Sequence, residues 1–324
     1  MAFSGPFTVD GLPAQLLYQE FLDGLALYNT RSNVFMDQFC LRTTQKTVRI
    51  DQSAAQMKAA GLGTVEPPIT QPAYTDITLA DSIPYEVAVG YTKKAVEKGI
   101  HSEELRNIFR DGIKADNDLI QQLILGAIMT DGSLWDATMT TAPPQFLSNV
   151  FATTHDHYLA YNVSGTPALT HVSALKLTIT HHGYGRNGAG VVCFWNSTQA
   201  EKWARLAEPV TQHAWSSAMM DVLQRLGVPL EGTFTIDGVP MIVNDWIPED
   251  YLVAAAVGVK SVRWRDPEGL GTGAPLILAS IDDFVQGTQM LRRWGSATVV
   301  LRGAAAVAYL GGASYTSPTH WSYL

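Results

Sequence analysis

The strongest constraint on the fold is a long helical pattern between Ser102 and Met129. Apolar side chains recur there at three- and four-residue spacing, at Leu105, Ile108, Phe109, Leu119, Ile120, Leu123, Ile124, Ala127 and Ile128. Ser102 suits the N-cap position, and two carboxylates follow it in the first turn. A helix of about 28 residues spans about 42 Å at ~1.5 Å per residue, which exceeds the usual length in a globular protein. We therefore expect a spine over 102–129 on which other elements pack.

A strand, a long irregular segment and a second strand precede this helix. Residues 44–51 alternate in the manner of a β-strand, and the alternation resumes over 73–92. The segment 52–72 between them has no periodicity and contains several glycines and prolines, which interrupt regular structure. Because a two-stranded arm is marginally stable on its own, we expect a neighbouring molecule to hold it.

The chain is poor in charge. Charged residues make up 16% and hydrophobic residues 46% of the 324 residues, and 22 basic against 30 acidic residues give a net charge of −8. This composition excludes a disordered chain and, with two cysteines, a disulfide scaffold. The acidic balance argues against a sequence-reading nucleic-acid binder. Soluble domains average about 25% charge, and interface cores are depleted in charge. The shortfall therefore indicates surface that is buried against other copies of the chain.

The remaining patterns are shorter and include both helices and strands. Helices are expected over 12–28 and 198–208. Strands are expected over 191–196, 232–248, 282–294 and 297–310. The Asp237-Gly238 dipeptide predicts a hairpin turn. The predicted fold class is α+β.

Nothing in the sequence indicates export or membrane insertion. Residues 1–10 contain no Lys or Arg and no apolar core, unlike a signal peptide. The longest apolar runs, 251–259 and 304–310, are much shorter than the roughly 20 residues that span a bilayer. We expect synthesis in the cytoplasm and no membrane partner, with Cys40 and Cys193 as free, buried thiols.

Four segments, through their order and spacing, carry a resemblance to a known family. They are VEPPITQPAYTDITLADSIPYEVAVGYTKKAVEKG (65–99), FWNSTQAEKWARLAE (194–208), LEGTFTIDGVPMIVNDWIP (230–248) and RRWGSATVVLRGAAAVAYL (292–310). The chain resembles the major capsid proteins of tailed bacteriophages with the HK97-type fold. In that family the first segment corresponds to the extended loop and its return strand. The third corresponds to a hairpin of the axial domain, and the fourth to the closing strand of the peripheral domain.

The resemblance implies an HK97-like capsid fold with four parts. These are an N-terminal arm (1–43), an extended loop or β-arm (44–83), a peripheral domain with the spine helix 102–129 (84–150 and 292–324), and an axial α/β domain (151–291). It also implies contacts between subunits through the β-arm and the N-terminal segment. We predict these contacts at Phe3, Phe7, Lys58, Gly61, Glu66, Pro67, Pro68 and Tyr74.

The function that the resemblance implies is structural, with no catalytic residues and no cofactor. Many copies, arranged as hexamers and pentamers, would form an icosahedral shell around double-stranded DNA, assembled in the host cytoplasm and found in the virion. A portal and separate scaffolding and decoration proteins are the further partners. The mild negative charge suits a shell that contacts packaged DNA without sequence specificity. Some family members join subunits through a Lys on the extended loop, but no Asn partner can be assigned to Lys58, which we interpret as a solvated side chain.

Two alternatives remain open. One is an encapsulin nanocompartment, which has the same fold but encloses cargo enzymes. The other is a metal-dependent hydrolase that uses His155, His157, His171 and His181, because imidazole and carboxylate groups at such spacing bind zinc. We favour a packing role for these histidines, since a metal site also needs a third ligand and outer-shell support. Protonation of the cluster near pH 6 would then loosen a subunit contact.

Overall fold

The structure of the chain is a computed structural model that describes residues 8–9, 12–31, 33–51, 74–89, 102–130, 150–152, 154–186, 190–206, 234–280 and 289–318. Its α-helices are α1 (Ala14–Thr30), α2 (Val34–Phe39), α4 (Ser102–Met129), α5 (Leu169–Thr180) and α6 (Ala200–Leu206). Short 3-10 helices are η1 (Ser197–Gln199), η2 (Glu268–Leu270) and η3 (Arg302–Ala304). Within these described ranges, no helix is both long enough and apolar enough to cross a membrane.

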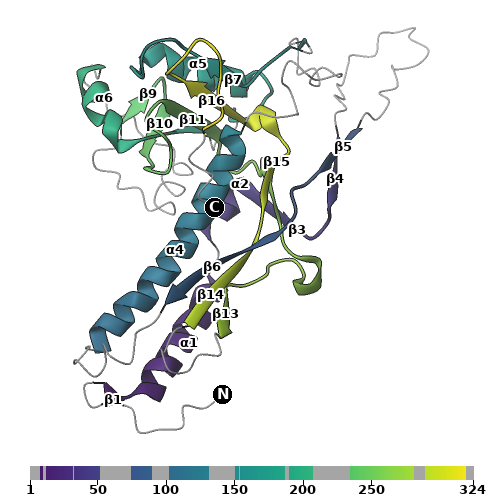
Figure 1. The fold of residues 1–324 in the computed structure, drawn as a ribbon. Helices are drawn as coiled ribbons and strands as arrows, with labels where there is room; N and C mark the ends of the chain where they lie inside the picture. The colour runs from purple at the N-terminus through teal and green to yellow at the C-terminus, as the bar shows by residue number, and fades with distance from the viewer. Residues whose placement is uncertain are drawn as a thin grey trace.

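The spine helix α4 begins and ends at the expected residues, Ser102 and Met129. Figure 1 shows it running diagonally from the six-stranded sheet at one end of the molecule to the N-terminal helix α1 at the other. Its C-terminal half is buried along one face, at Ile120, Ile124, Leu125, Ile128 and Met129. The helix therefore links the two ends of the molecule and anchors its second half in the main core.

The largest sheet has six strands in the order β7-β16-β11-β8-β10-β9. Their bounds are β7 (Tyr158–Ala160), β8 (Val191–Trp195), β9 (Thr235–Ile236), β10 (Val239–Val243), β11 (Tyr251–Ala256) and β16 (Ala305–Tyr309). The pairs β10–β8 and β16–β7 are parallel, and the other pairs are antiparallel. The expected hairpin is confirmed, because Asp237 and Gly238 have φ angles of 51° and 73° between β9 and β10, as a type I′ turn requires.

Both faces of this sheet are buried, which explains why its central strands are apolar throughout. Alternate residues of β8 point to opposite faces. Val192 and Phe194 join the core formed with α2 and α4. Val191, Cys193 and Trp195 join a second core on the side of α5. The sheet is thus a middle layer between helices.

Smaller sheets complete the fold. One has the order β15-β12-β3 and another the order β13-β14-β6, while β4–β5 and β1–β2 are two-stranded. Their bounds are β1 (Thr8–Val9), β2 (Leu12–Pro13), β3 (Cys40–Thr43), β4 (Thr47–Asp51), β5 (Tyr74–Thr78), β6 (Ile83–Val89), β12 (Val262–Arg265), β13 (Ile277–Ser280), β14 (Gln289–Gly295) and β15 (Ala297–Val299). The sheet of β6, β13 and β14 packs on α1 through Phe21, Leu25, Leu276 and Leu291.

The prediction of a single strand over residues 297–310 is wrong. Residues 297–299 form β15, which pairs with β12, whereas residues 305–309 form β16, which lies between β7 and β11 in the six-stranded sheet. The 3-10 helix η3 separates β15 from β16. The chain changes direction there because the two strands pair with different neighbours. The sheets also join strands that are far apart in the chain, since β16 shares a sheet with β8 and β12 pairs with β3.

Candidate functional site

The β-arm begins as two antiparallel strands, with β4 and β5 in register from Thr47 opposite Thr78 to Asp51 opposite Tyr74. Figure 1 shows the pair standing away from the body of the molecule. Within the part of the chain that the structure describes, no third strand joins this sheet. The sequence-based expectation of an outgoing and a returning strand is confirmed for these residues.

The base of the arm is fixed, while its outer side faces solvent. Ile77, Leu79 and Val300 form a small buried cluster at the base. On the outer side the Tyr74 side chain is 56% exposed, and the Arg49 guanidinium lies 4.0 Å from the centre of its ring. The arm therefore presents an aromatic side chain and a cation next to a strand edge that no other described strand covers, a combination that suits contact with another surface.

A second exposed apolar surface lies beside the spine. Val243, the last residue of β10, is 51% exposed, and Trp246, three residues after it, is 41% exposed, although the other residues of β10 are buried. The segment is held on α4 by Asn244, whose Nδ2 donates to Gln121 Oε1 at 3.1 Å. The sequence pattern of this stretch predicts a hairpin but not its exposure, because nothing in the pattern marks which side of a strand end is left uncovered.

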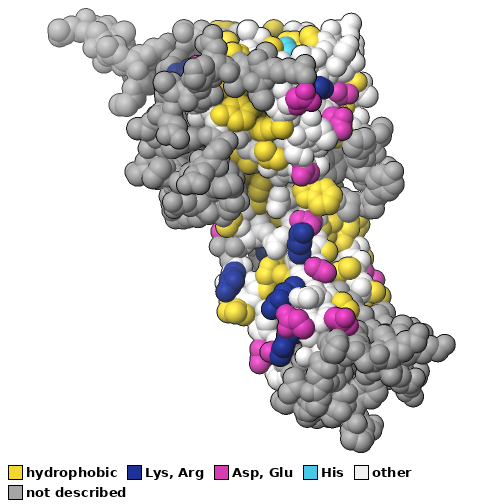
Figure 2. Space-filling view, turned by 90° about the vertical axis from the view of Figure 1, so that its left-hand side faces the viewer, with side chains coloured by type: hydrophobic (Ala, Val, Ile, Leu, Met, Phe, Trp, Pro, Cys, Tyr) yellow, Lys and Arg dark blue, Asp and Glu magenta, His cyan; other side chains and the backbone are white. Residues whose placement is uncertain are grey.

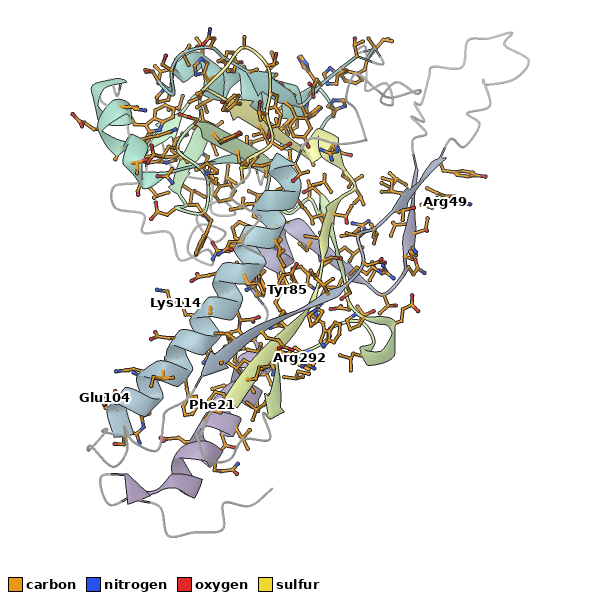
Figure 3. All side chains as sticks on the ribbon, in the orientation of Figure 1. Phe21, Arg49, Tyr85, Glu104, Lys114 and Arg292 are labelled. Carbon is orange, nitrogen blue, oxygen red and sulfur yellow. The ribbon has the colours of Figure 1, made fainter. Side chains whose placement is uncertain are left out.

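The other half of α4 is charged. Figure 2 shows basic and acidic side chains interspersed over the lower part of one face, below a region where hydrophobic side chains gather. Arg106 pairs with Glu20 of α1 at 3.1 Å. Glu104 and Lys114 are exposed, and Figure 3 shows them on the side of α4 that faces away from β6 and β14. Exposed pairs of this kind favour solubility more than stability.

A buried ion pair ties the spine to β14. Arg293 Nε donates to Asp116 Oδ1 at 2.7 Å and its Nη2 donates to Asp116 Oδ2 at 2.5 Å. The Tyr28 hydroxyl of α1 donates to the same carboxylate at 2.8 Å. Burial and the negative charge of Asp116 raise the pKa of Tyr28, which therefore stays protonated. The group fixes α1, α4 and β14 to one another.

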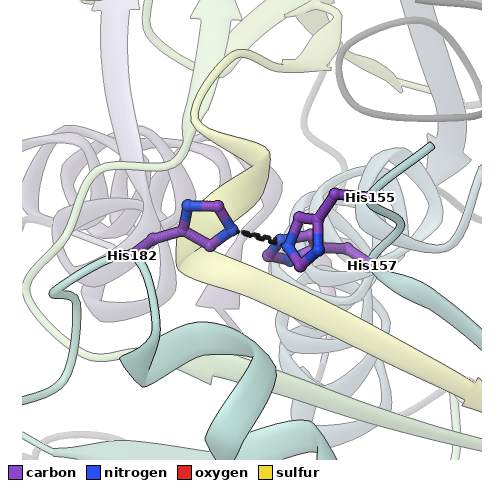
Figure 4. Close-up of side chains that lie close together, drawn as sticks. All are labelled: His155, His157 and His182. Carbon is purple, nitrogen blue, oxygen red and sulfur yellow. Dashed lines mark hydrogen bonds between the residues drawn. The ribbon is translucent and has the colours of Figure 1, made fainter. Parts of the chain in front are cut away.

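Three histidines form the densest chemical cluster among the described residues. His155 and His157 precede β7, and His182 follows the end of α5. His182 Nε2 lies 2.9 Å from His155 Nε2 and 2.9 Å from His157 Nε2, and Figure 4 shows the rings converging. Three imidazoles placed in this way offer nitrogen ligands to a cation.

Burial is the main influence on the charge of these rings. It lowers the pKa of His155, of His157 and, to about 3, of His182, and neighbouring imidazoles lower each pKa further. His157 and His182 are therefore neutral at pH 6. The prediction that the cluster becomes protonated near pH 6 is wrong for these two residues.

The membership of the cluster also differs from the expected set. His171 lies apart from it, because its Nδ1 accepts from the Ala168 backbone N–H at 3.1 Å and its ring stacks on Tyr161. His182 takes the place expected for His181. The His181-His182 doublet was visible in the sequence, but only the path of the chain after α5 decides which ring turns inward.

Of the predicted subunit contacts, the structure places Tyr74. Its exposure on β5 is compatible with that role. The others lie outside the described residues; they are Phe3, Phe7, Lys58, Gly61, Glu66, Pro67 and Pro68. Cys40 and Cys193 are both free and buried, as expected.

Comparison with known proteins gives a clear result at the level of structure. No protein-family model and no curated protein sequence matches the chain. A solved structure described as Mycobacterium phage Patience is similar, with a TM-score of 0.58, 15% identity, and coverage of 98% of this chain and 96% of that chain. The mature capsid of bacteriophage PhiM1 has a TM-score of 0.52 and 9% identity and covers 88% of each chain.

A third similar structure is the capsid of an empty GTA particle, with a TM-score of 0.51, 11% identity, and coverage of 87% of this chain and 91% of that chain. The chain has an HK97-like capsid fold. The expected fold class, α+β with a long spine helix, is thereby confirmed. At these identities the likeness concerns the HK97-like fold itself.

Proposed function

We propose that this chain is the subunit of an icosahedral shell that encloses the double-stranded DNA of a tailed phage. The observation that carries the proposal is the extent of the HK97-like fold: the likeness to a phage structure covers 98% of this chain and 96% of the other. The PhiM1 structure, which covers 88% of each chain, is a mature capsid. A shared fold over the whole length, rather than over one module, favours a shared mode of assembly.

The β-arm supports self-assembly. Two strands with a solvent-facing Tyr74 gain little from folding alone, so an arm of this kind is stabilised when it lies on a neighbouring subunit. In the proposed shell the β-arm and the N-terminal segment make these contacts, through Tyr74 together with the predicted residues Phe3, Phe7, Lys58, Gly61, Glu66, Pro67 and Pro68. Heterologous contacts repeated around hexamers and pentamers then close the shell.

The proposed parts of the subunit are those of the capsid family. Residues 1–43 form an N-terminal arm, 44–83 the extended loop, 84–150 and 292–324 the peripheral domain, and 151–291 the axial domain. Separate scaffolding and decoration proteins and a portal complete the particle, which assembles in the host cytoplasm and becomes the virion. The net charge of −8 suits a shell that holds DNA without binding it tightly.

Electron microscopy of particles purified from cells that express the full phage gene set tests this proposal. We expect large shells with a dense DNA core. Small shells that contain protein and no nucleic acid would support an encapsulin instead. A discrete small oligomer would refute both kinds of shell.

A single substitution tests the role of the arm. We expect Tyr74→Ser to reduce the yield of particles strongly, since loss of an aromatic anchor weakens a contact by roughly 30-fold, while the circular dichroism of the subunit stays unchanged. Leu177→Ser is the matched control, because Leu177 is 53% exposed but lies on α5. Equal particle yields for the two variants in sedimentation would contradict an assembly role for Tyr74.

A further inference from the structure

The cluster of His155, His157 and His182 has a geometry that the proposed shell function does not use. All three offer a ring nitrogen, and these nitrogens lie within 4.8 Å of one another. We propose that the three imidazoles bind a first-row divalent cation, with Zn²⁺ as the best fit. The inference is independent of shell assembly, since every ligand comes from one chain.

The spacing of the nitrogens is close to that of a zinc site. Zinc lies about 2.0–2.1 Å from each histidine nitrogen, which puts two ligand nitrogens about 3.3 Å apart in a tetrahedral arrangement. The two close contacts to His182 Nε2 are 2.9 Å each. The two contacts to His182 Nε2 therefore need to lengthen by only a few tenths of an ångström, while the ligand nitrogens of His155 and His157, which lie within 4.8 Å of each other, move together around the ion.

Counting protons shows why a cation suits the cluster better than hydrogen bonds do. His157 Nδ1 lies 2.7 Å from the Ala305 carbonyl oxygen, and a carbonyl only accepts, so Nδ1 carries the proton and Nε2 a lone pair. His182 Nε2–H must then donate to His157. With its hydrogen directed there, His182 Nε2 has neither a second hydrogen nor a lone pair for His155. Neutral rings thus satisfy one of the two close contacts, whereas a cation bound by three lone pairs satisfies all three Nε2 atoms.

The surroundings support the ligands. The hydrogen bond from His157 Nδ1 to Ala305 O orients that ring, which is the outer-shell arrangement found for metal-bound histidines. Phe151 stacks on the His182 ring with 4.1 Å between ring centres. His157 and His182 are buried, whereas His155 is half-buried and provides the route to solvent. Arg302 lies close enough to lower the pKa of His157, and its charge opposes the cation in part.

Asp156 is not among the ligands. Its Oδ1 accepts from the Tyr158 backbone N–H at 2.9 Å, which shapes the turn into β7. The ion would therefore have three nitrogen ligands and one position for water. Imidazole nitrogen ligands in this arrangement favour Zn²⁺, Co²⁺ or Ni²⁺ over Mg²⁺ and Ca²⁺, because the latter two ions prefer oxygen ligands.

Such an ion would join segments that are far apart in the chain. It would tie the entry into β7 to the end of α5, and through His157 to the first residue of β16. These segments meet at the edge of the six-stranded sheet, where β7 is the outermost described strand and pairs with β16 alone. We therefore expect a structural role, in which the ion stabilises this edge of the sheet.

The test uses the untagged full chain with zinc chloride as the probe. We expect a single zinc ion per chain after dialysis, measured by mass spectrometry of the metal. We expect His155→Ala to weaken zinc binding by more than about 100-fold in a chelator competition, since outer-shell changes alone cost about 10–100-fold. His181→Ala, next to His182 but outside the cluster, is the matched control and should bind as the unaltered chain does. Equal affinity of His155→Ala and the unaltered chain would overturn the proposal.

A second measurement covers the case in which His155→Ala does not fold. Cobalt chloride added to the unaltered chain should produce the intense visible absorption of tetrahedral cobalt, and excess zinc should remove it. The thermal midpoint should also rise with zinc concentration, because an ion that binds the folded chain alone stabilises it. The absence of both the cobalt absorption and the zinc-dependent midpoint would refute the site.

Discussion

The buried pair of Arg293 and Asp116 offers the sharpest test of how this fold is held together. Its side chains are 7% and 2% exposed, and the shortest N–O distance is 2.5 Å. Two unit charges about 4 Å apart attract by about 4 kcal/mol at an effective dielectric of 20, but both ions have also lost their hydration. The pair therefore adds little net stability, whereas removal of one partner leaves an unpaired buried charge.

We predict that Asp116→Asn lowers the free energy of unfolding by about 3–5 kcal/mol. The assay is urea unfolding of dissociated subunits followed by tryptophan fluorescence, with Asp76→Asn as the matched control. Asp76 makes the same two-point contact with Arg49, at 2.9 and 3.2 Å, but the two side chains are 48% and 61% exposed. The control should leave the midpoint within experimental error, because solvent screens the pair.

The double variant Asp116→Leu with Arg293→Met separates charge from packing. The partners left behind are satisfied: the Tyr28 hydroxyl also lies 2.9 Å from Asn117 Oδ1, and Arg42 donates to the Ala274 carbonyl, as Arg293 does. We expect the double variant to be as stable as the unaltered chain or more so. If Asp116→Asn costs no more than Asp76→Asn, the reasoning that the buried pair is desolvated is wrong.

Three further predictions concern packing and burial. A Cβ at Gly295 would overlap the indole of Trp264, which is completely buried, so Gly295→Ala should destabilise by about 1–3 kcal/mol in thermal unfolding. Gly24→Ala, with nothing within 4 Å of its Cβ on helix α1, should instead stabilise by about 0.5–1 kcal/mol, and a loss of stability there would contradict the open site. Burial raises the pKa of the Cys40 thiol, and it raises the pKa of the Cys193 thiol to about 12. Both thiols therefore stay protonated at pH 8 and should react with a thiol reagent only after unfolding. Reaction in the folded chain at the rate of a free thiol would show that they are accessible.

Local patterns were sufficient for several elements. The helix over 102–129 was predicted to the residue because its cap, its apolar spacing and its length all lie within one segment. The turn at Asp237-Gly238 was equally local, since it depends on two residues that tolerate positive φ. The helix expected over 198–208 begins instead as η1, with Asn196 as its N-cap, because several neighbouring polar residues suit that position equally well.

The candidate sites depended more on long-range contacts. His155 and His157 are evident candidates in the sequence, but His171 and His181 are the wrong partners for them, because His182 reaches them only through the packing of α5 on the sheet. The resemblance places Tyr74 at a subunit contact, whereas nothing in the sequence marks Trp246 as exposed. Neither the pairing of His182 with the other two histidines nor the exposure of the segment after β10 is marked by a pattern in the local sequence.

By itself, the sequence determined the spine helix, the two strands of the arm, the hairpin and the low charge that indicates buried surface. Only the tertiary structure decided that 297–310 is divided between two sheets, that β8 and β10 run parallel, and that His182 completes the histidine cluster. The physical reason is the range of the interactions. Helix spacing and turn conformation arise among residues a few positions apart, whereas strand partners and converging side chains are selected by the packing of the whole core.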